Sequence, residues 1–218
     1  MSTDFLGEPD FLALLRFWED ERGNRALPEW HGDMTRVPHD LLPNLTVSEI
    51  EGEPIYKYVG SECIRRWGGD PTGQPVYRSL KGVHSAYIWS VRQDSVARRA
   101  PIFSAAIYRP ADGSMLLTGR LFAPFVSPGA AEPDVMLTLQ LFKGSDTTVA
   151  DLGNTGFVDE TQRQMVVAAP ELLARLEAAR RYHAVARRAH QEALARDMAR
   201  IAQELAGSAL VSLPCFKG

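Results

Sequence analysis

LTVSEIEGEPIYKYVGSECIRRWGGDPTGQPV, residues 45–76, changes from an alternating pattern of apolar and polar residues to a helical one. The alternation covers residues 45–52 and 54–60, which predicts two antiparallel strands joined as a hairpin. Gly60 would end the second strand, and SECIRRW would then form a short helix closed by the two glycines that follow it. The sequence DPTG, residues 70–73, predicts a turn into a further helix.

The glycines of this stretch raise the alternative of a nucleotide-binding loop. A P-loop requires G-x-x-x-x-G-K-[ST], and a dinucleotide-binding loop requires G-x-G-x-x-G between a strand and a helix. Neither spacing occurs in the set Gly60, Gly68, Gly69 and Gly73. The GGD at 68–70 is similar to the start of a nucleotide-cyclase signature, but Pro71 and Thr72 replace the acidic and aromatic residues expected next. We therefore expect these glycines to have an architectural role.

The flanking segments predict helices before and after the hairpin and three strands beyond them. Residues 9–22 have an apolar face with helical spacing, formed by Phe11, Leu14, Leu15 and Trp18. A second helical spacing covers residues 79–100. Residues 101–110, 113–126 and 134–144 are rich in β-forming residues and predict an antiparallel meander. The fold class is therefore α+β with one antiparallel sheet, and residues 145–169 have no assignment.

A long helix is predicted from Pro170 to Ala206, with Gly207 after its end. Its apolar and small residues are spaced by threes and fours, with a phase shift near the middle, as in the contact seam of a coiled coil. We expect this seam to form a homodimer contact through Leu176, His183, His190, Leu194, Met198, Ile201 and Leu205. A phospho-accepting role for His190, as in a sensor kinase, is not expected, because the usual acidic and proline neighbours are absent.

Composition excludes several classes of protein. The chain has 218 residues and a formal net charge of −3, which does not favour nucleic-acid binding. The two cysteines, Cys63 and Cys215, are too few for a disulfide framework. No basic leader and no apolar run of about 18 residues occurs, so we expect a cytoplasmic protein without a membrane span. The five histidines lack zinc-site spacing, and no G-x-S-x-G is present, so no metal site or hydrolase is predicted.

A family resemblance rests on four segments. They are LLRFWEDERGNRALPEW (14–30), the leucine-proline entry with strands and turn at 41–76, the central helix, and APFVSPGAAEPDVMLTLQLF (123–142). Over residues 11–143 they resemble the PAS domain superfamily, and within it a group of short bacterial PAS-like proteins known mainly from alphaproteobacteria. The resemblance implies a five-stranded antiparallel sheet with short helices on one face enclosing a small pocket. Such domains act in signal transduction, as sensors or as dimerisation platforms.

The resemblance also suggests a domain organisation. Residues 1–43 would be an N-terminal helix and connection, and residues 44–145 would be the PAS-like sensor domain. Residues 146–218 would be a linker and the long C-terminal helix with a short tail. Haem-binding members use a histidine in the helix before the third strand, where His84 lies, but we expect a capping or exposed role for His84 instead. Flavin-binding members use a cysteine motif of which ECIRRW keeps only Cys-x-Arg, so no cofactor is assigned.

Strand alternation supplies candidate pocket residues, because it would place Tyr56 and Tyr58 on one face of the second strand. The candidates together are Tyr56, Tyr58, Cys63, Ile64, Trp67, His84, Tyr87, Phe103 and Ser104. We expect a non-enzymatic cytoplasmic sensor that binds a small ligand or a signalling partner protein and dimerises through its terminal helices. Two alternatives stay open: a structural adaptor with a filled core, and an enzyme that uses the PAS-like cavity.

Overall fold

The computed structural model describes residues 8–76, 82–109, 116–144, 158–159 and 163–166, together with single positions at 174, 177, 188 and 196. At 82–87, 107–109, 158–159 and 163–166 the description covers the backbone alone. The chain divides into two compact units, Met1–Glu177 and Ala178–Gly218. The first unit holds every helix and strand whose bounds are given below.

The order of elements agrees closely with the prediction. Helix α1 comes first, two 3-10 helices and a hairpin follow, then helices α2 and α4, and then the meander. The bounds are α1 Pro9–Arg22, η1 Met34–Arg36, η2 His39–Asn44, β1 Leu45–Glu49, β2 Tyr56–Val59, α2 Ser61–Trp67, α4 Gly82–Arg98, β3 Ile102–Arg109, β4 Leu116–Phe125, β5 Val135–Gly144, β6 Val158–Asp159 and β7 Arg163–Val166.

The strands form one antiparallel sheet. Its order is β2-β1-β5-β4-β3-β6 within the described residues, and β7 also pairs with β3. The expected five-stranded antiparallel sheet is therefore confirmed as β2-β1-β5-β4-β3. The short strands β6 and β7 extend it from residues for which the sequence had supplied no assignment.

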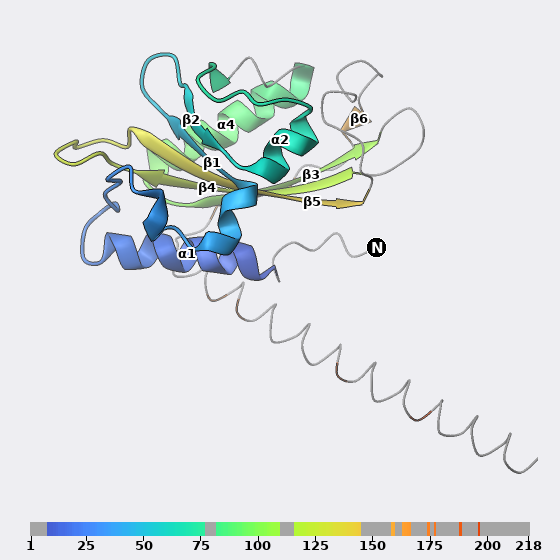
Figure 1. Cartoon of the computed structure of the whole chain (residues 1–218), viewed down its shortest axis with the longest axis horizontal. Coiled ribbons are helices and arrows are strands. Elements are labelled where there is room, and N and C mark those ends of the chain that lie inside the picture. The colour runs from blue at the N-terminus through green and yellow to red at the C-terminus, as the bar shows by residue number, and fades with distance from the viewer. Residues whose placement is uncertain are drawn as a thin grey trace, which may run out of the picture. The chain divides into compact units, whose positions relative to one another are not determined.

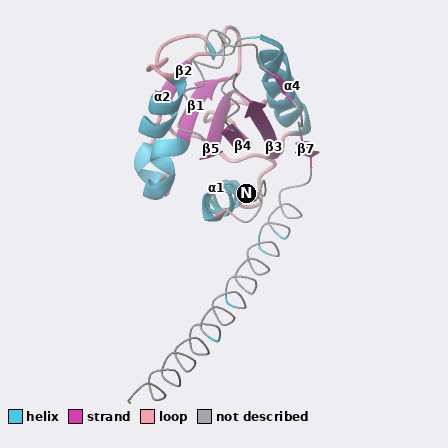
Figure 2. Cartoon of the chain, turned by 90° about the vertical axis from the view of Figure 1, so that its right-hand side faces the viewer, coloured by secondary structure: helices cyan, strands magenta, loops and turns pink. Residues whose placement is uncertain are grey.

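Helices cover both faces of the sheet, as the two perpendicular views show (Figures 1 and 2). Helix α1 lies on one face, here called the outer face, and α2 and α4 lie on the other, here called the inner face. The resemblance implied helices on one face, and that expectation holds for α2 and α4. The position of α1 adds a third layer, because its broad apolar face needs a sheet surface of its own to cover it.

The outer face holds the main hydrophobic core. All of the helix positions predicted to share a face, Phe11, Leu14, Leu15 and Trp18, are buried there. The Phe11 ring meets the Phe103 ring of β3 edge-on, with 5.2 Å between centroids. Beyond the last β3–β4 pair, the Trp18 indole N–H donates to the Pro124 carbonyl oxygen at 2.8 Å. These contacts fix α1 across the central strands.

Helix α2 is positioned by the residues at its two ends. Gly68 closes it in the left-handed region, with φ of 78°, as the sequence predicted. At its beginning, Gly60 donates its N–H to the Leu45 carbonyl oxygen at 2.8 Å. A Cβ at Gly60 would overlap the backbone of Leu42 and Pro43, so glycine allows η2 to approach closely. The predicted short helix and its glycine boundaries are confirmed.

The predicted C-terminal helix over residues 170–206 lies outside the described residues, apart from the four single positions, which are helical. Its dimer-contact residues, from Leu176 to Leu205, all fall outside the described part. The homodimer therefore stays a prediction.

Candidate functional site

The inner face of the sheet is polar although it is buried. Residues that alternate with the outer core along β1, β3, β4 and β5 point toward α2 and α4. Many of them carry hydroxyl, amide or guanidinium groups. The buried polar residues of the described part are Thr46, Ser48, Arg66, Arg92, Ser95, Ser104, Thr118, Arg120, Thr138 and Gln140. An antiparallel sheet commonly turns polar residues to water, but here helices cover them.

Three of these residues form a row across neighbouring strands. Ser104 of β3 is opposite Arg120 of β4, and Arg120 is opposite Gln140 of β5. Directly opposite residues of antiparallel strands have Cβ atoms about 4.5–5.5 Å apart, so the three side chains are neighbours on the inner face. Ser104 is fully buried, and Arg120 and Gln140 are 6% and 4% exposed. We call Ser104, Arg120 and Gln140 the polar row.

Hydrogen bonding of this face is incomplete within the described residues. Arg120 donates from Nη1 to Thr118 Oγ1 at 2.9 Å. Glu19 Oε1 of α1 is buried without a hydrogen-bond partner among the described residues, and on the inner face the same holds for three atoms, Ser48 Oγ, Ser104 Oγ and Gln140 Nε2. Leaving a buried polar group unsatisfied costs about 1–3 kcal/mol. Two of these three atoms flank Arg120 in the polar row, which makes the row the strongest candidate for a binding site.

The buried charges of the inner layer are positive. The buried charged residues of the described part are Arg66, Arg92 and Arg120, with no Asp or Glu among them. Arg66 Nε donates to Glu62 Oε1 at 3.1 Å, and its guanidinium lies over the Phe142 ring. Arg92 donates to the Glu49 carbonyl oxygen, and burial lowers the pKa of Arg92 to about 10. Arg66 thus lies over the central strand β5, and Arg92 is bound at the end of β1.

Cys63 lies in this layer and is chemically protected. It is fully buried, and burial raises the pKa of its thiol to about 12, against the opposing positive charge of Arg120. A thiolate is the reactive form of cysteine, so a buried neutral thiol is a poor nucleophile or metal ligand. The interaction with Arg120 also places α2 close to the polar row.

Several predicted pocket residues come together beside Cys63, but they form a packed cluster. Tyr56, Val59, Cys63 and Val76 are buried together, and Ile64 and Trp67 pack against them. The rings of Tyr56 and Trp67 lie 5.6 Å apart between centroids. This contact is an aromatic pair of the kind found in ordinary cores.

Two predicted pocket residues face the other way. Tyr58 packs against the outer core and donates from its hydroxyl to the Leu42 carbonyl oxygen at 3.0 Å. The expectation that Tyr56 and Tyr58 share a face is wrong, because the β1–β2 register shifts at this point and pairs Val47 with Tyr58 but Ser48 with Tyr56. Phe103 also belongs to the outer core, so only its neighbour Ser104 points inward.

Two predicted site residues remain, and both belong to the first part of α4. His84 and Tyr87 lie within α4, and their side chains fall outside the description. Among the described residues, no three or more His, Cys, Asp or Glu side chains are grouped so that they could hold a metal ion. Within the same residues, no helix combines the length and apolar character that crossing a membrane requires.

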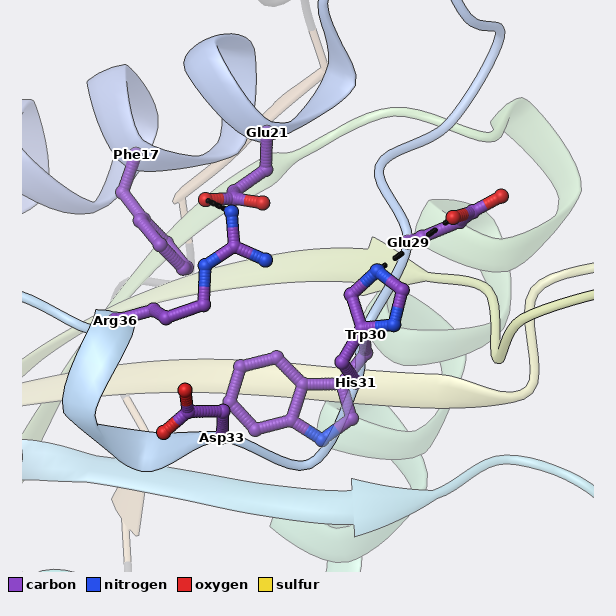
Figure 3. A pocket seen from close by; sticks show the side chains of 7 residues that line it. All are labelled: Phe17, Glu21, Glu29, Trp30, His31, Asp33 and Arg36. Carbon is purple, nitrogen blue, oxygen red and sulfur yellow. Dashed lines mark hydrogen bonds and ion pairs between the residues drawn. The ribbon is translucent and has the colours of Figure 1, made fainter.

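A small pocket lies on the other side of the molecule, between α1 and the following loop (Figure 3). Its enclosed volume is about 10 Å³, which is room for about one water molecule. Arg36 points to Glu21 at 2.8 Å, and the His31 ring points to Glu29 at 3.6 Å (Figure 3). Asp33 accepts hydrogen bonds from the hydroxyl and from the backbone N–H of Thr35, and the hydroxyl first and then the N–H lower the pKa of Asp33. These mutual contacts use the charged groups that a ligand would need.

The sequence analysis did not identify Arg120, Gln140 or Ser48. A signal was present, because TGRLF in β4 and TLQLF in β5 place polar residues at every second position. Such alternation is the normal pattern of a half-exposed strand, so by itself it does not indicate a buried polar face. That face is buried because α2 and α4 pack over it, and the residue pattern of the strands contains no information about this packing.

Compared with known protein families, with curated proteins and with solved structures, the chain has no match.

Proposed function

We propose that the chain is a non-enzymatic, PAS-like sensor domain that binds a small ligand between the polar row and the helices α2 and α4. The observation that carries this proposal is the pair of unpartnered buried atoms, Ser104 Oγ and Gln140 Nε2, on either side of Arg120. A bound ligand would supply the missing hydrogen bonds. The antiparallel sheet with helices over this face supports the PAS-like interpretation.

Hydrogen bonds join α4 to the sheet, so a ligand bound beneath α4 could change the position of this helix at the surface of the protein. Arg92 donates to the Glu49 carbonyl oxygen at the end of β1. The Ser95 hydroxyl donates to the Ala100 carbonyl oxygen at 2.8 Å, and its oxygen lies 3.3 Å from the Phe122 carbonyl oxygen of β4. A ligand that changes the packing of the inner layer would therefore shift α4 relative to the sheet. We propose that a signalling partner or a second copy of the chain, in the cytoplasm, recognises this change.

A structural adaptor with a filled core is the second candidate. The packed cluster of Tyr56, Cys63 and Trp67 favours it, because side chains occupy the space where part of the pocket was expected. In that case the chain would present its surface to a partner and bind no small molecule. The unpartnered atoms of the polar row favour the sensor over the adaptor.

The decisive experiment is to identify what co-purifies with the full chain. Protein purified at neutral pH is measured by native mass spectrometry, then denatured, and the released small molecules are identified by liquid chromatography and mass spectrometry. A stoichiometric ligand in the wild type that is absent from Arg120→Met supports the sensor. Protein that carries no small molecule, and that no compound of a metabolite library stabilises against heat, contradicts it and supports the adaptor. The native spectrum also tests the proposed dimer.

A further inference from the structure

We propose that the polar row recognises a small organic carboxylate with one negative charge and a short apolar body. This inference rests on the proposed function and specifies the ligand of that same site. Arg120 would bind the carboxylate, with Ser104 and Gln140 as flanking donors. The apolar part would lie on the Phe122 side of the row.

The row presents donors. A guanidinium has N–H donors and no acceptor, and the Nε2 atom of glutamine is likewise a donor. The Ser104 hydroxyl can donate as well, and both flanking groups lack a partner among the described residues. Arg120 keeps its bond to Thr118 and makes further interactions, so it is held in place beside them. Convergent donors around a guanidinium match the oxygens of a carboxylate.

The charge of the inner layer favours an anion. The described residues bury three arginines and no acidic side chain. Arg66 forms an ion pair with Glu62, and Arg92 donates a hydrogen bond to the Glu49 carbonyl oxygen. Both of these arginines therefore make contacts outside the polar row. Arg120 is the arginine that belongs to the row itself. One central cation with neutral donors beside it suits a single negative charge better than a phosphate dianion.

The neighbours of the row determine the rest of the ligand. In the sheet register, Phe122 stands opposite Thr138 on one side of the row, and Phe142 stands opposite Thr118 on the other. All four alternate with the outer core and belong to the inner face. Because Arg66 covers the Phe142 ring, the hydrocarbon part of a carboxylate held by Arg120 would lie on the Phe122 side, beside the apolar cluster of Ile88, Val91 and Met136. Aliphatic or aromatic monocarboxylates of modest size fit this description.

The test is thermal and calorimetric titration of the full chain at constant ionic strength. The probes are acetate, butyrate, hexanoate and benzoate, the amide of each acid, and sodium chloride, sulfate and inorganic phosphate. At least one monocarboxylate is expected to stabilise the wild type, and its amide is not. The exposed control Arg65→Met removes a nearby charge on α2 outside the polar row, and it should bind as the wild type does.

Two variants of the row sharpen the result. Arg120→Met is expected to weaken binding by about 10- to 100-fold, the loss expected for hydrogen bonds to a charged group. Gln140→Glu places a carboxylate opposite Arg120, so it should raise the melting temperature without ligand and abolish binding of the acids. The second variant keeps the proposal testable if Arg120→Met does not fold.

Distinct outcomes separate this inference from the proposed function. Equal binding of acids and amides, or unchanged binding in Gln140→Glu, would overturn the carboxylate while leaving a ligand-binding domain. Stabilisation by phosphate or sulfate alone would also overturn it. If no probe binds and the purified protein carries no small molecule, both the inference and the proposed function fail.

Discussion

Gly60→Ala is a direct test of how α2 is held over the inner face. Gly60 has φ of −68° and ψ of 153°, a conformation that alanine adopts freely. Judged by backbone entropy alone, the change would stabilise the fold by about 0.4–1 kcal/mol. The surroundings reverse that sign, because the new Cβ would lie 2.5 Å from the Pro43 carbonyl carbon and closer still to two carbonyl oxygens.

The size of the effect follows from the overlap. Carbon atoms pack best at about 3.5–4.0 Å, so backbone must move by about 1 Å. All of the overlapping atoms belong to the backbone of η2, and none is a flexible side chain that could turn away. Overpacking typically costs about 1–3 kcal/mol, and we expect the upper end. For a domain of this size, about 3 kcal/mol lowers Tm by about 6–12 °C.

Urea unfolding followed by circular dichroism measures the loss of stability. Gly69→Ala is the matched control, because its Cβ would have no neighbour within 4 Å, and it should stay within about 0.5 kcal/mol of the wild type. A Gly60→Ala protein as stable as the Gly69→Ala control would refute the close approach of η2 to α2.

Three further predictions concern α1 and α2. Trp18→Phe removes the donor to the Pro124 carbonyl and should cost about 1–3 kcal/mol, measured by urea unfolding; an unchanged midpoint would contradict that bond. Burial raises the pKa of the Cys63 thiol to about 12, so in a Cys215→Ser background iodoacetamide should label it at pH 8 only after denaturation. Hydrogen bonds from Arg65 and then Arg66 lower the pKa of Glu62. The contribution of the Glu62 carboxylate to stability is therefore present above its unfolded pKa and is lost as pH falls through the lower folded pKa. Glu62→Gln should accordingly reduce the fall in the free energy of unfolding on the acid side of its pH profile.

The outer half of the fold was predictable because its patterns are local. The apolar face of α1 repeats with helical spacing, and its burial against the sheet needs no further information. The strands of the meander are long enough for their composition to identify them. The glycine after SECIRRW marks the end of α2 because its φ of 78° favours glycine. Each of these features depends on residues that lie near one another in the sequence.

The candidate site was not predictable in the same way. The face assigned to Tyr58 depends on a register shift opposite Val47 and Ser48, which belong to another strand. The alternation around Arg120 and Gln140 is equally typical of a solvent-exposed face. Only the packing of α2 and α4 over that face makes those residues buried. Strands β6 and β7 were missed because two and four residues are too few to give a clear period.

The contrast between the two faces is the best argument for a bound molecule. The outer face buries aromatic and aliphatic side chains and supplies hydrophobic stabilisation. The inner face leaves Ser48, Ser104 and Gln140 with unpartnered atoms among the described residues. At about 1–3 kcal/mol each, these atoms cost an amount comparable to the total stability of a typical domain, about 5–15 kcal/mol. An adaptor would be more stable with apolar residues at these positions. In the proposed sensor these residues would have a role, because a bound ligand would complete the hydrogen bonds that the protein alone leaves open and would stabilise the layer beneath α4.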